Sequence, residues 1–122
     1  MGSTTFSGPV TSEDGFVGTI SGAFKGDVQT VTTSTAANLT TLSTVMAPPG
    51  AGNLAITLAD GYAGQLKILT VSSTGGGSAV VTPTTFANGT TLTFNAAADT
   101  CMLLFVATVG WTLVSDRSVT VA

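Results

Sequence analysis

The feature that most constrains the fold of this chain is a succession of short segments rich in Val, Ile, Leu and Thr. Turns containing Gly, Pro or Asn separate them about every ten residues. In segment 53–59 the apolar residues alternate, which places Leu54, Ile56 and Leu58 on one face of an extended chain. No segment shows the apolar period of an amphipathic helix. The spacing predicts an all-β fold with an antiparallel β-sandwich or a barrel-like body. The expected strands span residues 28–35, 53–59, 65–72, 79–82, 90–95, 101–108 and 111–115, and segment 38–46 is expected to be a strand or irregular.

Residues 1–27 differ from the rest of the chain, because glycine recurs there and every second residue from Phe16 to Gly26 is Phe, Ile or Gly. In an extended strand these alternate residues share one face, and glycine in a strand often marks the close approach of another backbone. We therefore expect an extended Gly-rich N-terminal arm, residues 1–27, that docks on a foreign surface and precedes a β-sandwich body, residues 28–122. The alternative is a flexible glycine-rich leader. The candidate docking residues are Phe6, Phe16, Gly18, Ile20, Gly22, Phe24 and Gly26.

The chain carries unusually few charges: three Lys or Arg and six Asp or Glu among 122 residues, a net charge of −3. Because soluble surfaces normally carry about 25–35% charged residues, we expect much of this surface to be buried against copies of the chain or a partner. The acidic balance argues against binding to nucleic acid. The first residues lack the basic and apolar parts of a signal peptide, and the longest apolar run, 101–109, is about half a membrane span. We expect a protein made in a reducing cytosol, without a nucleic-acid or membrane partner.

Segment 101–106 is apolar at every position. A strand that is apolar on both faces is typical of an interior strand covered on both sides. One face would meet the core, and a subunit interface is the economical cover for the other. Met102, Leu104 and Val106 are therefore candidate interface or core residues. Trp111 is assigned to the core or interface as well, with an exposed sugar-binding Trp as the alternative.

Little in the sequence supports catalysis. The chain has no His and a single Cys, which excludes imidazole catalysis and an internal disulfide. Cys101 is interpreted as a buried apolar residue rather than a nucleophile, and Lys67 is expected to face solvent. The Gly75–Gly77 run is interpreted as a hairpin tip, since no helix follows it as in a phosphate loop. The acidic residues are expected at turns, with an incidental cation site left open. We expect no enzyme, no cofactor and no metal centre.

Several segments resemble known structural proteins of tailed bacteriophages. Segment 5–16, Thr-Phe-Ser-Gly-Pro-Val-Thr-Ser-Glu-Asp-Gly-Phe, is similar to the opening of such proteins. Segments 60–67, 81–83 and 86–94, together with Leu-Leu-Phe at 103–105 and Gly-Trp at 110–111, resemble the β-domain of phage capsid decoration (cement) and head-fibre proteins. The resemblance covers most of the chain.

This resemblance implies a homotrimeric β-rich knob on the outer capsid surface, with the N-terminal arm as the capsid-binding segment. The expected function is therefore that of a structural virion protein made in the host cytoplasm. It would stabilise the capsid as a trimeric decoration protein, with itself and the major capsid protein as partners. The alternative is a trimeric tail-fibre or receptor-binding segment that holds host glycan. Copy number per particle would distinguish the two.

Overall fold

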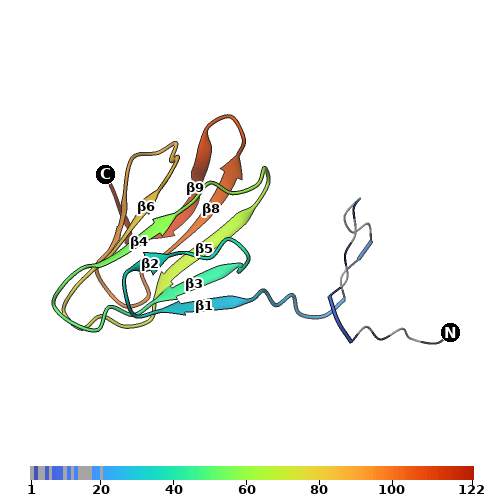
Figure 1. Cartoon of the computed structure of the whole chain (residues 1–122), viewed down its shortest axis with the longest axis horizontal. Helices are drawn as coiled ribbons and strands as arrows, with labels where there is room; N and C mark the ends of the chain where they lie inside the picture. The colour runs from blue at the N-terminus through green and yellow to red at the C-terminus, as the bar shows by residue number, and fades with distance from the viewer. Residues whose placement is uncertain are drawn as a thin grey trace.

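The computed structural model describes residues 2, 5, 7–9, 11, 13, 18–19 and 21–122, and it is all-β, with no helix among these residues. Ten strands form two five-stranded sheets (Figure 1), with the orders β1-β3-β5-β8-β9 and β10-β7-β6-β4-β2. The strands are β1 (Val28–Val31), β2 (Thr35–Ala36), β3 (Ser43–Met46), β4 (Leu54–Leu58), β5 (Leu66–Val71), β6 (Ala79–Pro83), β7 (Leu92–Phe94), β8 (Thr100–Val106), β9 (Gly110–Arg117) and β10 (Thr120–Val121). We call the sheet that contains β1 the first sheet and the other the second sheet.

The first six strands alternate between the two sheets, so the chain winds between the sheets instead of forming hairpins. Strands β1, β3 and β5 are parallel neighbours in the first sheet, and β2, β4 and β6 are parallel neighbours in the second. The later pairs, β6–β7, β5–β8, β8–β9 and β7–β10, are antiparallel. The prediction of an antiparallel body is therefore wrong for half of the pairs, because an alternating strand followed by a turn does not specify which sheet the next strand enters.

The connections at one end of the two sheets stack on each other. Residues 32–34, 47–53 and 72–78 link β1 to β2, β3 to β4 and β5 to β6. The backbone N–H of Gly75 donates to the carbonyl of Pro48 at 2.9 Å, and the N–H of Leu54 donates to the carbonyl of Ser78 at 2.8 Å. The glycine run 75–77 thus joins strands of different sheets, and its prediction as a hairpin tip is wrong. We call these three connections the stacked turns.

The buried side chains of both sheets form one hydrophobic cluster, as in a β-sandwich, and the sheets do not close into a barrel. Leu54, Ile56 and Leu58 all lie in this cluster, as the alternation of segment 53–59 predicts. The rings of Phe105 and Trp111 meet edge to face, with centroids 5.2 Å apart and planes at 76°. The barrel-like alternative is therefore excluded for the described residues.

Candidate functional surface

The outer side of the first sheet carries an apolar surface. Strand β8 is an interior strand of that sheet, as predicted, and its residues alternate between two environments. Cys101, Leu103 and Phe105 are buried in the core, whereas the residues between them are only half-buried and point to the opposite side. We call this side the outer apolar face, and its apolar residues are Val28, Val45, Leu66, Ile68, Met102, Leu104 and Val106.

Sheet register brings these residues into neighbouring rows. Ile68 pairs with Met102 and Leu66 pairs with Leu104, so the apolar side chains of β5 and β8 lie next to each other. Leu66 remains 45% exposed, and Val28, at the edge of the face, 57%. Within the strands, the charged residue on this side is Arg117, which pairs with Thr100 at one end of the face. Thr or Ser residues also lie on this side in each of the five strands. The face is therefore uncharged over most of its extent and apolar mainly where β5 and β8 adjoin.

A depression of about 380 Å³ lies at the Arg117 end of this face. Its lining includes Ile68 and Met102 from the outer apolar face and Ser115 from β9. Near the same surface, the hydroxyl of Thr112 is buried and has no hydrogen-bond partner among the described residues. The depression is lined partly by apolar side chains, and the titratable residues of its lining are Cys101, Asp116 and Arg117.

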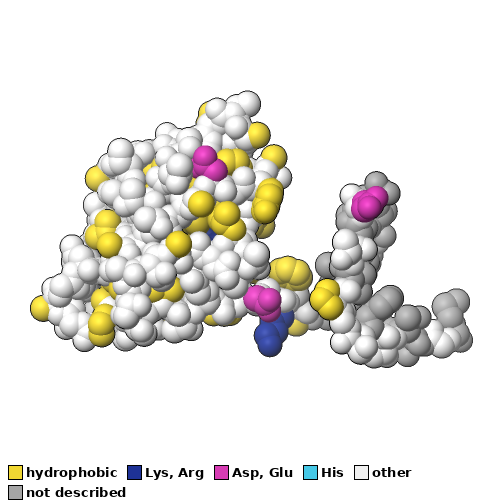
Figure 2. Space-filling view, viewed as in Figure 1, with side chains coloured by type: hydrophobic (Ala, Val, Ile, Leu, Met, Phe, Trp, Pro, Cys, Tyr) yellow, Lys and Arg dark blue, Asp and Glu magenta, His cyan; other side chains and the backbone are white. Residues whose placement is uncertain are grey.

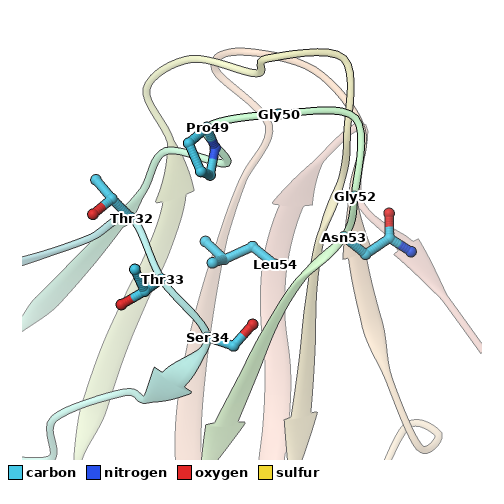
Figure 3. Close-up of a pocket in the computed structure, with 8 residues that line it drawn as sticks. All are labelled: Thr32, Thr33, Ser34, Pro49, Gly50, Gly52, Asn53 and Leu54. Carbon is cyan, nitrogen blue, oxygen red and sulfur yellow. The ribbon is translucent and has the colours of Figure 1, made fainter.

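A second depression, of about 350 Å³, lies at the stacked turns (Figure 3). Its polar residues are turned away or already bonded. The hydroxyl of Ser34 accepts a hydrogen bond from the N–H of Ala55 at 3.0 Å, and the side-chain oxygen of Asn53 accepts one from the N–H of Ser78 at 3.3 Å. Figure 3 shows the side chain of Leu54 between them, with no polar groups converging on the hollow. This depression lacks the convergent polar contacts of a small-molecule site.

Lys67 lies on the inner side of the first sheet, fully buried, so its predicted exposure to solvent is wrong. Its ammonium donates hydrogen bonds to the carbonyls of Asn38 and Thr41 at 2.7 and 2.9 Å, and to the Thr41 hydroxyl at 3.1 Å. Burial lowers the pKa of Lys67 from 10.5 to about 8. The residue fastens the connection between β2 and β3 to β5, and it is closed to any substrate.

The other residues considered for chemistry have structural roles. Cys101 is buried, as predicted, and its pKa is raised to about 12 by desolvation and, secondarily, by the charge of Asp116, which makes the thiol unreactive. Trp111 lies in the core and donates its ring N–H to the carbonyl of Ala59 at 2.9 Å, which excludes it as a sugar platform. Asp99 accepts hydrogen bonds from the N–H groups of Asn95 and Ala96 at 2.8 and 2.9 Å and thereby shapes a turn. Among the described residues no three His, Cys, Asp or Glu side chains gather as metal ligands would.

The structure describes only part of the predicted docking arm. Phe6, Phe16 and Ile20 lie outside the described residues. Phe24 is 73% exposed, and Gly22 has a φ of 99°, a conformation that glycine adopts without strain. At Gly26 a side chain would collide with Leu42, so the close approach expected at a glycine occurs here, against this chain's own body.

The space-filling view shows how few charges this protein carries. Charged side chains are scarce on the visible face of the body (Figure 2). An acidic and a basic side chain lie beside each other where the N-terminal segment joins the body. That region contains Lys25 and Asp27, immediately before β1. The sparse charge is thus a property of the folded surface as well as of the sequence.

Comparison with protein-family models, with curated proteins and with solved structures gives no match for this chain. In the part of the chain that the structure describes, no helix has the length and apolar character needed to cross a membrane. The outer apolar face is accordingly the strongest candidate for a functional surface, and its chemistry is that of protein association.

Proposed function

We propose that this chain is a structural virion protein that binds the outer surface of a phage capsid and stabilises it as a homotrimeric decoration protein. The observation that carries the association part of this proposal is the outer apolar face. Met102, Leu104 and Val106 occupy an interior strand, yet the side of the sheet on which they lie has no cover among the described residues. The cores of protein interfaces are apolar and depleted in charge, as this face is.

The capsid part of the proposal is supported by the resemblance of segment 5–16 to the opening of phage structural proteins, and of segments 60–67, 81–83, 86–94, 103–105 and 110–111 to phage decoration and head-fibre proteins. It is also supported by the exposure of Phe24, because this apolar side chain lies next to the body and is not packed into the core. Decoration requires no catalytic group. An interface of standard size buries on the order of 1,600 Å², and its repetition over a shell would clamp neighbouring capsid subunits together.

A second candidate is a tail-fibre or receptor-binding segment that holds host glycan. Tyr62 favours it, because this aromatic residue is 76% exposed on a loop between β4 and β5. The two candidates differ in the number of copies per particle. Hundreds of copies copurifying with heads would indicate decoration, and a few or tens copurifying with tails would indicate a fibre.

The experiment that tests the proposal is cosedimentation of the purified protein with undecorated heads. Replacing Phe16, Ile20 and Phe24 together by Ser is expected to weaken binding by orders of magnitude. Fully burying each such side chain contributes about 1.5–3 kcal/mol.

Tyr62→Ser is the matched control for this triple variant, because it removes an exposed aromatic side chain from the body and leaves the arm intact. It is expected to bind heads as the wild type does. Saturation of the heads by the triple variant at wild-type concentrations would refute the arm as the anchor. Failure of the wild-type protein to cosediment with heads would favour the fibre candidate. Circular dichroism checks that each variant is folded.

A further inference from the structure

The two sheets have four edge strands, and three of them are protected against pairing with another chain. Strand β9 has a bulge at Val114 and carries Asp116 and Arg117 in its second half. Strand β10 is only two residues long. Bulges, charges and short length are the usual means by which proteins protect sheet edges.

The edge of β2 is covered by a side chain of its own molecule. The Gln29 amide donates a hydrogen bond to the carbonyl of Ala36 at 3.1 Å, and its oxygen accepts one from the N–H of Asn38 at 2.7 Å. Gln29 thereby occupies backbone groups along the β2 strand and the residues that follow it.

Strand β1 has none of these protections. Its sequence, Val-Gln-Thr-Val, contains no charge and no proline, and Figure 1 shows no strand beyond it in the sheet. The N–H groups of Ser43 and Ala47 in the β3 region donate to the carbonyls of Asp27 and Val31. In a parallel ladder of this register the backbone groups of residues 27, 29 and 31 point toward β3. The N–H and C=O groups of Val28 and Thr30 therefore point away from the sheet.

We propose that β1 pairs with β1 of a second copy of this chain, antiparallel, across a two-fold axis at Gln29. In this register Val28 lies opposite the second copy's Thr30, and each pair exchanges two hydrogen bonds, as the narrow pairs of an antiparallel ladder do. The two first sheets become one continuous sheet. The outer apolar faces are then also continuous, because Val28 belongs to both the edge and the face.

The charges near the edge are compatible with this pairing. Asp27 falls opposite the second copy's Val31, and Lys25 falls opposite the second copy's Thr33, so no like charges meet. A strand of four residues buries far less than the roughly 1,000 Å² that a stable interface needs. The contact is therefore weak in solution and becomes effective where copies are held close together.

On the proposed function, this pairing links neighbouring trimers on the capsid, since each trimer presents three β1 edges. It rests on that function only for its biological setting. The pairing itself is a property of the isolated protein.

Thr30→Pro is the variant that tests the pairing, because it removes an outward-pointing donor without breaking a bond to β3. Proline is tolerated at such edge positions. Thr30→Val is the matched control, since it keeps the backbone donor and a β-branched side chain. Sedimentation equilibrium up to millimolar concentration should show the wild type and Thr30→Val associating beyond their basic unit, with doubling as the first step. Thr30→Pro should raise the dissociation constant of that step by about tenfold or more, because each copy loses one donor.

A measurement on the wild type alone covers the case in which Thr30→Pro fails to fold. Amide hydrogen exchange at Val28 and Thr30 should slow as the concentration rises, while exchange at Gln29, which is bonded to β3, should stay constant. Doubling by Thr30→Pro at the wild-type concentration, absence of a doubling step, or concentration-independent exchange at Thr30 would each overturn the pairing. The experiment detects association of the basic unit with a second one, whether that unit is a monomer or a trimer. A monomeric unit would therefore refute the trimer of the proposed function without affecting the test of the β1 pairing.

Discussion

Single side chains on the inner side of the first sheet determine the path of the connection between β2 and β3. Lys67 binds the carbonyls of Asn38 and Thr41, and the Gln29 oxygen accepts hydrogen bonds from the N–H of Asn38 and the hydroxyl of Thr44. Buried backbone groups that lack a strand partner cost free energy unless a side chain satisfies them. These polar residues therefore stabilise one turn conformation instead of adding to the apolar core.

The buried lysine predicts a pH dependence of stability. The pKa of Lys67 is about 8 in the folded chain and 10.5 as the ordinary value. Between these values the unfolded chain binds more protons, so the free energy of unfolding rises with pH. Above about pH 9 the raised pKa of Cys101 acts in the opposite direction, because the unfolded thiol loses its proton first. Urea unfolding should thus show a rise from pH 8 to 9 that Lys67→Met lacks. The same slope in both proteins would contradict this assignment.

For some single residues the sequence pattern correctly indicated burial in the folded chain. Cys101 and Trp111 could be placed in the core because each stands in an apolar alternating strand. Lys67 and Leu69 are two residues apart in β5 and therefore lie on the same, inner side of the sheet. The alternation itself thus indicated that the Lys67 side chain is buried. Its charge argued for exposure, and the carbonyls that satisfy it come from a turn whose position was not apparent in the sequence.

At the scale of the elements, strand positions were more predictable than strand directions. Strands β4, β5, β6 and β8 fall within one or two residues of the expected segments, because alternation marks them clearly. The two-residue strands β2 and β10 have too few residues to show a pattern. The sequence did not indicate the parallel pairing, because turn residues such as Gly75–Gly77 occur in connections between sheets as well as in hairpins.

The stacked turns predict effects of different size for two glycines in the same region. A side chain at Gly77 would overlap the carbonyls of Gly52 and Gly50, whereas a side chain at Gly50 would have no neighbour within 4 Å. Gly77→Ala should destabilise the protein by about 1–3 kcal/mol, because the turns must separate. Gly50→Ala should change stability by less than about 0.5 kcal/mol. Thermal unfolding of both variants measures the difference, and equal melting temperatures would argue against close stacking.

The molecule as a whole combines two outer surfaces of different character. The outer side of the second sheet carries exposed or half-buried threonines on β4, β6, β7 and β10, among them Thr57, Thr82 and Thr93. These hydroxyls can interact with water without charge. On the first sheet, hydroxyls also lie on the outer side, but the adjoining apolar side chains of β5 and β8 cannot interact with water in this way. This contrast fits a body that associates through one sheet only. The β8 half of that face could be predicted from its sequence. The β1, β3 and β5 contributions required the sheet order.

A charge introduced on the outer apolar face should therefore weaken the oligomer, whereas the same charge on the outer side of the second sheet should leave the oligomer unchanged. Leu104→Glu places a carboxylate in the proposed interface, where desolvation costs several kcal/mol by order of magnitude. Thr93→Glu places the same group, also half-buried, on the threonine-rich side. Light scattering should give three times the 12.0 kDa chain mass for the wild type and for Thr93→Glu. Leu104→Glu should give a smaller mass, and a trimer in Leu104→Glu would remove this face from the interface.

The winding of the chain between two sheets also has a kinetic consequence. Register partners such as Ser43 and Ile68, or Leu54 and Ala79, are 25 residues apart in sequence. Long loops must therefore close before the parallel strands gain any contacts, and such topologies fold slowly. The β8–β9 hairpin is local, because only three residues separate Val106 from Gly110. During synthesis the segments that leave the ribosome first thus wait longest for their partners, and the last long strands to be made are the first able to pair.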